Sequence, residues 1–291
     1  MRLAVTGHRG FIGGHVASRL ESAGHDVLRV EGDLRAAILP EADGYFHFAA
    51  KMGGVGFFSQ NQFEPILDNA LMDARVISHC RAHGIRLFYP SSACAYPVNL
   101  MEAGVPLHES LLTAPADPDQ MYGVEKYFIT RLAAHADFDL RVGILHTIYG
   151  EGQAWSGDRV KFPPQICYKF CRPEPIEVWG NGSQTRTFLY IDDAVDMILE
   201  IFFAESYRGP VNVSHPAEVS VREVVEILSE FTGRSDYHFN DKKPTGPSRR
   251  PVDTSKFCSN YSTRARIDTR TGFVRLYRAI KAQATETSRI G

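Results

Sequence analysis

A glycine-rich turn lies between a strand-like run and a helical pattern at the start of the chain. The apolar run covers residues 3–5, and Gly7, Gly10 and Gly13 follow it at a spacing of three. Residues 11–22 then carry apolar side chains at helical spacing. Glycines placed in this way permit a tight turn, close approach of a phosphate to the backbone, and close packing of the helix on the strand. The feature therefore predicts a parallel sheet covered by helices, with an anion bound where the first strand ends.

The same alternation of short apolar runs and helical patterns continues to residue 146. It predicts strands over residues 26–30, 45–50, 85–90 and 139–146, helices over 65–83 and 121–136, and a loop over 97–118. About fourteen residues separate the second and third strands, too few for a full helix and a further strand, so we expect an abbreviated crossover there. The predicted fold class is α/β, a Rossmann-type doubly wound parallel sheet.

The helical and strand patterns become weaker after Tyr149, where a second, smaller lobe is predicted. Residues 187–191 and 192–204 are expected as a strand and a helix that return to the sheet, 210–213 as its last strand, and 219–232 as a further helix. This predicts a nucleotide-binding domain over residues 1–148 plus about 187–213. The C-terminal substrate-binding lobe is then expected over residues 149–186 and 214–291.

The charge balance and the cysteines narrow the class of protein. The chain has 291 residues, with 32 Lys and Arg against 34 Asp and Glu, and this balance argues against a nucleic-acid partner. Its composition lacks an apolar run long enough to span a membrane, and a strand-like run begins at Arg2 where a leader would lie. The chain has an odd number of cysteines, without the spacing of zinc ligands: Cys80, Cys94, Cys167, Cys171 and Cys258. We therefore expect free thiols, no metal site and a soluble cytoplasmic protein.

An acidic residue follows the second predicted strand, where the adenosine ribose of a dinucleotide binds in such folds. Glu31 is placed to accept hydrogen bonds from both ribose hydroxyls, which favours NAD. Arg9 and Arg29 lie near enough to bind a ribose phosphate, so NADP stays open. The residues expected along the cofactor are Gly7, Gly10, Phe11, Ile12, Glu31, Asp33, Leu34, Ala49, Ala50, Lys51, Asn69, Tyr122 and Lys126.

A phenol and an ammonium lie four residues apart in the predicted helix over 121–136, which places them on one face. They are Tyr122 and Lys126, and a nearby cation favours phenolate, so the tyrosine is expected to act as a base near neutral pH. Together with Ser92 at the end of an earlier strand and the upstream glycine turn, they resemble the extended short-chain dehydrogenase/reductase family. The resemblance implies that Tyr122 is the acid/base, that Lys126 holds the cofactor ribose, and that Ser92 binds the reacting oxygen.

Four further segments resemble one branch of that family, the GDP-mannose 3,5-epimerases, and more loosely the GDP-L-fucose synthases. They are residues 49–57, 91–97, 155–161 and 179–186. The resemblance implies a transient ketone at carbon 4 of a GDP-hexose, with inversion at carbons 3 and 5 by two opposed acid/base groups, Cys94 and Lys161. The expected catalytic set is Ser92, Cys94, Tyr122, Lys126 and Lys161, and the expected substrate contacts are Gly56, Ser92, Ala93, Thr147, Lys161, Lys169, Gln184, Arg186 and Arg250.

Several alternatives stay open at this stage. Thr147 and Glu151 depart from the epimerase pattern, which leaves the sugar and the number of inverted centres undecided. One rival is an epimerase/reductase that acts on a 4-keto-6-deoxy sugar with NADPH, and another is a dinucleotide sensor without turnover. His146 fits either a ligand pocket or a buried structural role. The family resemblance also implies a homodimer in which the helices over 65–83 and 121–136 pair across a two-fold axis.

Overall fold

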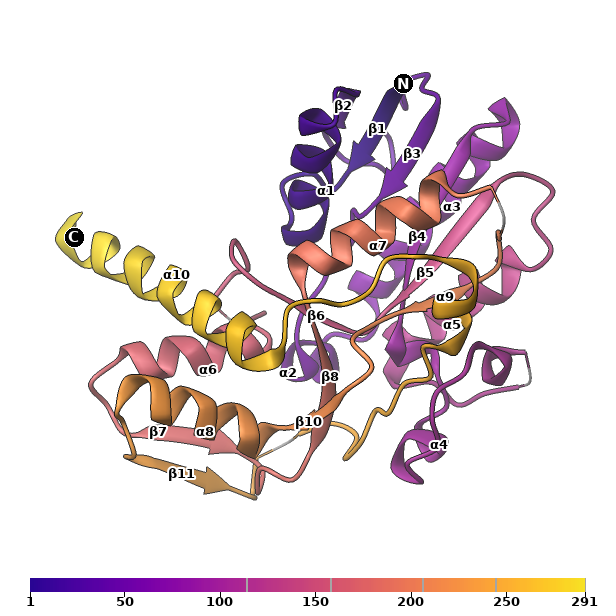
Figure 1. The fold of residues 1–291 in the computed structure, drawn as a ribbon. Coiled ribbons are helices and arrows are strands. Elements are labelled where there is room, and N and C mark those ends of the chain that lie inside the picture. The colour runs from indigo at the N-terminus through magenta and orange to yellow at the C-terminus, as the bar shows by residue number, and fades with distance from the viewer. Residues whose placement is uncertain (114, 158, 206, 244, 291) are drawn as a thin grey trace.

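The computed structural model describes residues 1–290 except Ala114, Asp158, Ser206 and Pro244, and it leaves the side chains of residues 55, 56 and 287–290 undescribed. Six parallel strands form the central sheet in the order β2-β1-β3-β4-β5-β9 (Figure 1). These strands are β1 (Arg2–Thr6), β2 (Asp26–Val30), β3 (Gly44–His47), β4 (Arg86–Ser92), β5 (Leu140–Leu145) and β9 (Val211–Val213). The predicted Rossmann-type parallel sheet is thereby confirmed.

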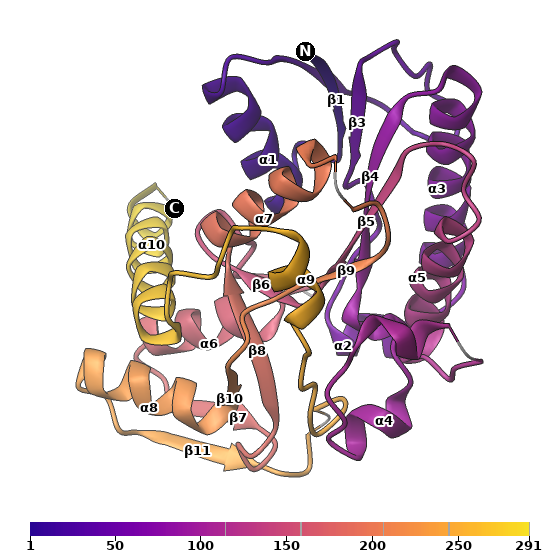
Figure 2. The same ribbon diagram turned by 45° about the vertical axis from the view of Figure 1, so that its right-hand side comes forward.

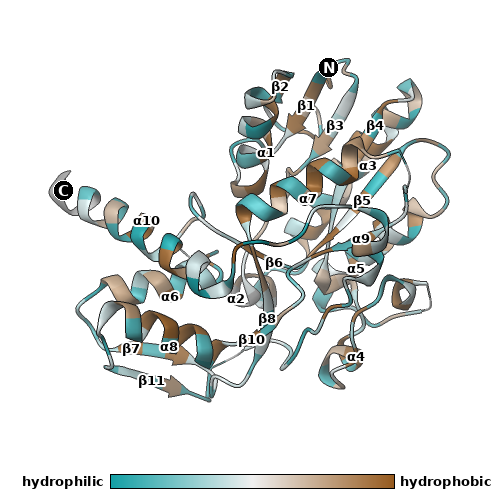
Figure 3. Ribbon diagram, viewed as in Figure 1, coloured by the Kyte–Doolittle hydropathy of each residue, from teal (hydrophilic) through white to brown (hydrophobic). Residues whose placement is uncertain are grey.

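Helices cover both faces of this sheet (Figure 2). On one side lie α1 (Phe11–Ser22) and α7 (Ile191–Phe203), and on the other α3 (Glu64–His83) and α5 (Gln120–Ala133). Successive side chains of a strand point to opposite faces, so Leu3 and Val5 pack with α1 and α7, whereas Ala4 packs with α3 and α5. In Figure 3 hydrophobic residues concentrate in the central strands, as this two-sided burial requires.

The chain order makes β1 and β3 the point where the sheet reverses its winding direction. β2 lies on one side of β1, and β3, β4 and β5 follow on the other. Residues 31–43 between β2 and β3 contain no helix or strand, so the predicted short crossover is confirmed. In open α/β sheets, ligands bind at the carboxyl ends of the strands at such a switch point.

A second group of elements lies below the sheet in Figure 1. A three-stranded sheet runs in the order β10-β8-β6, and a two-stranded sheet pairs β11 with β7. The helix α10 packs across α6 and α8. The bounds are β6 (Thr147–Tyr149), α6 (Phe162–Cys171), β7 (Ile176–Trp179), β8 (Thr185–Tyr190), β10 (Glu218–Ser220), α8 (Val221–Thr232), β11 (Tyr237–Asn240) and α10 (Thr269–Ile290).

Three sequence predictions need correction. The strand over 187–191 does not return to the main sheet, because β8 pairs with β6 and β10; only α7 and β9 return. The third strand ends at His47, three residues earlier than expected. The expected loop over 97–118 contains the short helices α4 (Val98–Glu102) and η2 (Glu109–Leu112). The division into two domains stays a prediction.

Three short helices complete the fold near the carboxyl ends of the central strands: α2 (Val55–Gln60), η1 (Ala93–Ala95) and α9 (Ser255–Asn260). None of the helices in the described ranges has both the length and the apolar character that crossing a membrane requires.

Candidate active site

The glycine turn after β1 packs so tightly against backbone atoms of the protein that it has no space for side chains. Gly7 has a φ of +66°, and a Cβ there would lie 2.5 Å from the backbone nitrogen of Ala49. A Cβ at Gly13 would lie 2.4 Å from the carbonyl oxygen of Gly7. Gly10 is the extended N-cap of α1, so the first amides of that helix face the turn. This cradle fits the pyrophosphate of a dinucleotide.

Charged residues surround the place expected for the adenosine ribose. Glu31 follows β2, and its carboxylate accepts from Arg9 at 2.9 Å and lies 3.1 Å from Nε2 of His8. Arg35 binds Asp33 and lowers the pKa of that carboxyl to about 2. Leu34 is buried in the core rather than presented to a ligand.

The segment that follows β3 is held in place by a side chain from α3. The amide oxygen of Asn69 accepts from the backbone nitrogen of Lys51 at 2.7 Å, and its nitrogen donates to the carbonyl oxygen of Lys51 at 3.3 Å. Lys51 forms an ion pair with Asp68. Asn69 therefore fixes the segment with Ala49 and Ala50 at the switch point of the sheet.

The Tyr122–Lys126 pair lies on α5 beside the end of β4. Both residues are buried, and the Tyr122 hydroxyl forms a hydrogen bond with Ser92. The ring of Phe58 from α2 stacks on the Tyr122 ring, with centroids 4.8 Å apart. Burial raises the pKa of Tyr122, while Lys126 and Ser92 oppose the rise. The direction is opposite to the one expected from the pair alone, because desolvation of the phenolate outweighs the cation.

Behind Lys126 lies a buried group of polar residues that sequence reasoning missed. Its ammonium donates to the hydroxyl of Tyr89 at 2.8 Å and lies 2.8 Å from Oε1 of Glu125 and 3.6 Å from Oδ2 of Asp73. His47 lies 2.9 Å from the other oxygen of Asp73. Asp73 follows Asn69 by four residues on one face of α3, and this spacing was the only available signal.

The same group sets the charge on Lys126. Burial works against the charge on Lys126, yet the carboxylates of Asp73 and Glu125 outweigh it and raise the pKa of the ammonium well above its usual value. Burial also raises the pKa of Glu125, and Lys126 opposes that rise. Lys126 is therefore held as a cation that faces two buried carboxyl groups.

The predicted acid/base residues meet a guanidinium from the distant segment after β11. Nη1 of Arg250 lies 3.4 Å from Sγ of Cys94, and Nη2 forms an ion pair with Asp119. Lys161 lies near enough to Cys94 and Arg250 to interact electrostatically with both, so the three side chains form one group. Lys161 as a residue is exposed, so the protein atoms that surround its ammonium, rather than complete exclusion of water, lower its pKa.

Two arginines converge here, and among the described residues an ion pair is formed by Arg250, with Asp119, but not by Arg186. Burial and the charge of Arg250 lower the pKa of Arg186, whose guanidinium donates only to backbone carbonyls among its described partners, those of Thr185 and Thr245. Nε of Arg250 is buried and has no hydrogen-bond partner among the described residues. Such an arrangement suits an anion with several oxygens.

The remaining predicted substrate residues are more scattered. Ala93 is buried in η1, and half-buried Thr147 begins β6. Lys169 donates to the carbonyl oxygen of Glu177 at 2.6 Å, and Gln184 to that of Trp179 at 2.9 Å, so both support β7. Gly56 lies in α2, and its surroundings fall outside the described part of the structure, as does Asp158 of the segment over 155–161.

Comparison with known proteins assigns the chain to a family. A family model described as the NAD dependent epimerase/dehydratase family matches residues 3–213, which span the glycine turn, the Tyr122–Lys126 pair and β9. The chain belongs to this family of NAD-dependent enzymes.

Among individual relatives, GDP-mannose 3,5-epimerase 1 of Oryza sativa subsp. indica is 35% identical over 264 residues, which cover 80% of this chain and 69% of that protein. GDP-L-fucose synthase 1 of Arabidopsis thaliana is 27% identical over 89% of this chain and 86% of its own length. Among solved structures, MoeE5 in complex with UDP-glucuronic acid and NAD has a TM-score of 0.82 at 26% identity, covering 97% of this chain and all of that one. UDP-glucose 4-epimerase of Thermotoga maritima, with a TM-score of 0.85 at 19% identity over 98% of this chain and 100% of that one, shares the fold.

Proposed function

We propose that the protein is an NAD-dependent epimerase that inverts carbon 3, carbon 5 or both in GDP-mannose or a related GDP-hexose, through a transient ketone at carbon 4. The observation that carries this proposal is the meeting of Cys94 with Arg250 and Lys161 next to the Ser92–Tyr122 pair. One group can then exchange a proton with the carbon 4 hydroxyl, and two others can serve the neighbouring carbons.

The cofactor would lie along the carboxyl ends of β1, β2 and β3. The turn from Gly7 to Gly13 would receive the pyrophosphate, Glu31 the adenosine ribose, and Lys126 the nicotinamide ribose. Bound NAD supplies a reversible hydride acceptor for carbon 4, which makes the complete cycle redox-neutral. Arg9 forms an ion pair with Glu31, so this arginine is not free to bind a ribose phosphate. The pairing therefore favours NAD over NADP.

Tyr122 would remove the proton of the carbon 4 hydroxyl as that carbon is oxidised and return it when the carbon is reduced. Ser92 would hold the reacting oxygen, and Lys126 would stabilise the phenolate. The resulting ketone makes the hydrogens on carbons 3 and 5 acidic, because their removal gives an enolate. Cys94 and Lys161 would then remove a proton from one face and return one to the other. The lowered pKa of Lys161 favours the neutral amine that such a base requires.

The diphosphate of the substrate would bind Arg186, with Arg250 reaching both the diphosphate and Cys94. Two buried guanidiniums that repel each other lose this repulsion when an anion lies between them. The unpartnered Nε of Arg250 supplies a further donor.

The test is to incubate the purified protein with GDP-mannose in deuterium oxide without added cofactor. We expect isomerised sugar with deuterium at the inverted carbons, and absence of both products would contradict the proposal. Cys94→Ser and Lys161→Ala should keep bound NAD and lose most of this exchange. Normal exchange in either variant would remove that residue from the mechanism.

The rival epimerase/reductase would need a 4-keto-6-deoxy sugar and would consume NADPH. The chain is less identical to the GDP-L-fucose synthases than to the GDP-mannose 3,5-epimerases, which favours the epimerase. Lys161 favours it too, because the fucose synthases carry a histidine at that position. A sensor without turnover needs no base, so the built Ser92–Tyr122 contact speaks against it.

A homodimer in the cytoplasm completes the proposal. The helices α3 and α5 contact each other and present one exposed apolar face formed by Phe63, Leu67, Leu71, Met121, Val124, Phe128 and Leu132. A second copy of the chain would cover this face by pairing the two helices with their own equivalents across a two-fold axis. The five free cysteines fit a reducing compartment.

A further inference from the structure

The edge strand of the central sheet carries a fully buried asparagine that joins four distant segments. Asn212 lies in β9, and its Oδ1 accepts from the hydroxyl of Tyr96 at 2.9 Å and lies 3.1 Å from Nε2 of His146. Its Nδ2 donates to the carbonyl oxygen of Leu107 at 2.8 Å and to that of Asp253 at 3.0 Å. These contacts use both donors and both acceptor positions of one amide group.

The amide of Asn212 has only one orientation that satisfies its neighbours. If the amide were rotated by half a turn, its oxygen would face the carbonyl oxygens of Leu107 and Asp253. These two carbonyl groups would then lose their hydrogen-bond donor. Because Oδ1 is therefore the acceptor, the Nε2 of His146 is the nitrogen that carries a hydrogen. The four contacts hold one another in a single arrangement.

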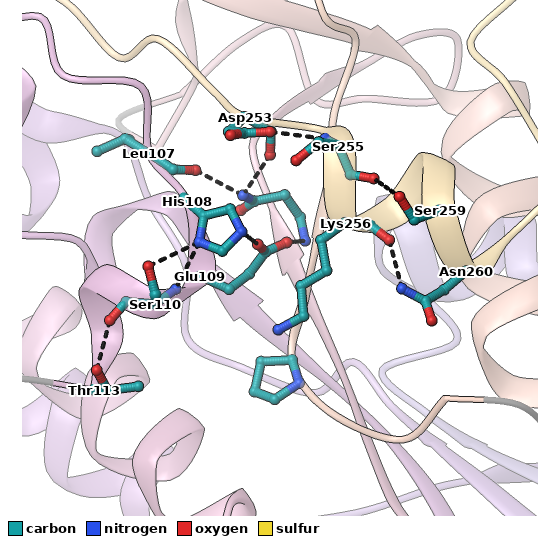
Figure 4. A network of polar contacts seen from close by, with 12 residues as sticks. Leu107, His108, Glu109, Ser110, Thr113, Asp253, Ser255, Lys256, Ser259 and Asn260 are labelled. Atoms are coloured by element: carbon teal, nitrogen blue, oxygen red, sulfur yellow. Dashed lines mark hydrogen bonds and ion pairs between the residues drawn. The ribbon is translucent and has the colours of Figure 1, made fainter.

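A buried glutamate forms a hydrogen bond with the backbone of Asn212. The amide nitrogen of Asn212 donates at 2.7 Å to Oε1 of Glu109, which is 4% exposed. Glu109 thus accepts a hydrogen bond at the edge of the sheet, beyond which the described residues form no further strand. Nε2 of His108 lies 3.6 Å from the second oxygen of Glu109, and Figure 4 shows both side chains packed between Leu107 and Lys256. We call Asn212, Glu109 and the backbone of Leu107 and Asp253 the clasp.

The clasp binds the segment that delivers Arg250. The nitrogen of Leu107 donates to the carbonyl oxygen of Pro251 at 3.0 Å, and the nitrogen of Asp253 donates to Leu107 at 3.3 Å, so residues 251–253 lie as a short bridge beside Leu107. Arg250 comes immediately before this bridge and contacts Cys94. In Figure 4 the chain at Asp253 and Ser255 lies directly against Leu107 and Glu109.

Three of the segments that contact Asn212 or the bridge lie next in sequence to residues proposed to bind or act on the substrate. Tyr96 lies two residues after Cys94, and His146 lies one residue before Thr147. Arg250 lies one residue before the bridge. By contrast, Tyr122 and Lys126 stand on α5 and are held by Ser92, Asp73 and Glu125, outside the clasp.

From this geometry we infer that Asn212 is a positioning residue for proton transfer at carbons 3 and 5: it keeps Arg250 against Cys94 and has no part in oxidation at carbon 4. The inference rests on the role of Cys94 in the proposed function. It assigns the two halves of one reaction to two separate supporting networks, the clasp and the buried group around Lys126.

The principal test is Asn212→Asp, which keeps the size of the side chain and removes both donors to Leu107 and Asp253. Because small displacements of a reacting group cost one to two orders of magnitude in rate, we expect solvent deuterium exchange at carbons 3 and 5 of GDP-mannose to fall at least about tenfold. Arg250 also forms an ion pair with Asp119, the N-cap residue of α5, but Tyr122 and Lys126 are held by Ser92, Asp73 and Glu125. Optical reduction of bound cofactor on mixing with GDP-mannose, which reports oxidation at carbon 4, should therefore keep its rate within about twofold.

Two variants at the other end of the clasp check the same inference if Asn212→Asp does not fold. Glu109→Gln keeps an oxygen for the amide of Asn212 and should behave like the parent, whereas Glu109→Leu removes it and should reproduce the selective loss of exchange. The matched control is Ser214→Ala, because Ser214 is equally buried, lies two residues along from Asn212, and donates to Thr187 outside the clasp. Equal slowing of both steps, no slowing, or the same loss in Ser214→Ala would overturn the inference.

A measurement without substrate separates this inference from the proposed function. If the parent protein does not isomerise GDP-mannose, the function fails, but the contact between Arg250 and Cys94 can still be read from alkylation of Cys94 by iodoacetamide, followed by peptide mass spectrometry. Nη1 of Arg250 lies 3.4 Å from Sγ of Cys94 and covers it on one side, so loss of this contact in Asn212→Asp should change the alkylation rate at least about threefold. An unchanged rate in Asn212→Asp would refute the clasp itself.

Discussion

Replacing Lys126 by methionine tests the buried charge arrangement behind the proposed catalytic pair. Lys126→Met removes the cation that faces Asp73 and Glu125 and leaves two buried carboxyl groups without it. Removing one partner of a buried ion pair costs about 3–5 kcal/mol, because the other charge stays desolvated. With an unfolding entropy of roughly 2.1 cal/mol/K per residue, this loss lowers the Tm of a 291-residue chain by roughly 5–8 °C.

The loss should depend on pH in a definite direction. Burial acts to raise the pKa of Asp73, but Lys126 and His47 outweigh it, and the lowered pKa contributes stability that is present at neutral pH and lost on acidification. The pKa of Glu125 is raised by burial, so its ionisation at higher pH lowers the stability of the folded protein. Without Lys126 both carboxyl groups bind protons more readily in the folded state. The deficit of Lys126→Met should therefore be largest at pH 7.5 and smaller at pH 5.5.

The assay is thermal unfolding of the parent and variant at both pH values. Lys161→Met is the matched control, since this lysine is also proposed to be catalytic but is exposed, and its loss should change stability by less than about 0.5 kcal/mol. An unchanged Tm for Lys126→Met at pH 7.5, or an equal deficit at both pH values, would refute the reasoning.

Three further predictions follow from other parts of the structure. Gly7→Ala places a Cβ 2.5 Å from the nitrogen of Ala49 at a positive φ, so the purified variant should carry less than about a tenth of the parent's bound NAD by mass spectrometry; full occupancy would contradict the cradle. Phe128→Glu places a charge on a side chain that is 61% exposed in the apolar face of α5, so light scattering should report monomer, and a persistent dimer would place the interface elsewhere. Arg186→Gln should weaken binding of GDP alone by at least about tenfold in calorimetry, whereas unchanged affinity would remove this arginine from the diphosphate site.

Much of the Rossmann-type domain could be predicted from the sequence because its signals are local. Glycine spacing, apolar period and strand length each act within about twenty residues, and they correctly place β1, α1, α3 and α5. The Tyr122–Lys126 pair is equally local, since four residues on a helix share a face. Even so, the sign of the shift in the pKa of Tyr122 was misjudged, because burial comes from tertiary packing and not from the pair.

The pairing of β8 with β6 and β10 could not be predicted in this way. A strand presents the same alternating pattern to any neighbour, so residues 187–191 fit the main sheet equally well on sequence alone. The edge position of β9 and the packing of α7 leave β8 to pair below the sheet.

The sequence alone determined that this chain has a dinucleotide cradle, a phenol and ammonium on one helix, and a thiol after a strand. Only the tertiary structure decided what surrounds them. Arg250 reaches Cys94 across 156 positions, and Asn212 joins segments up to 116 positions away. The polar groups around Lys126 come from α3, β3 and β4 as well as from α5 itself. Contacts over such separations depend on how whole layers pack, whereas residue spacing governs only what one helix, strand or turn can bring together.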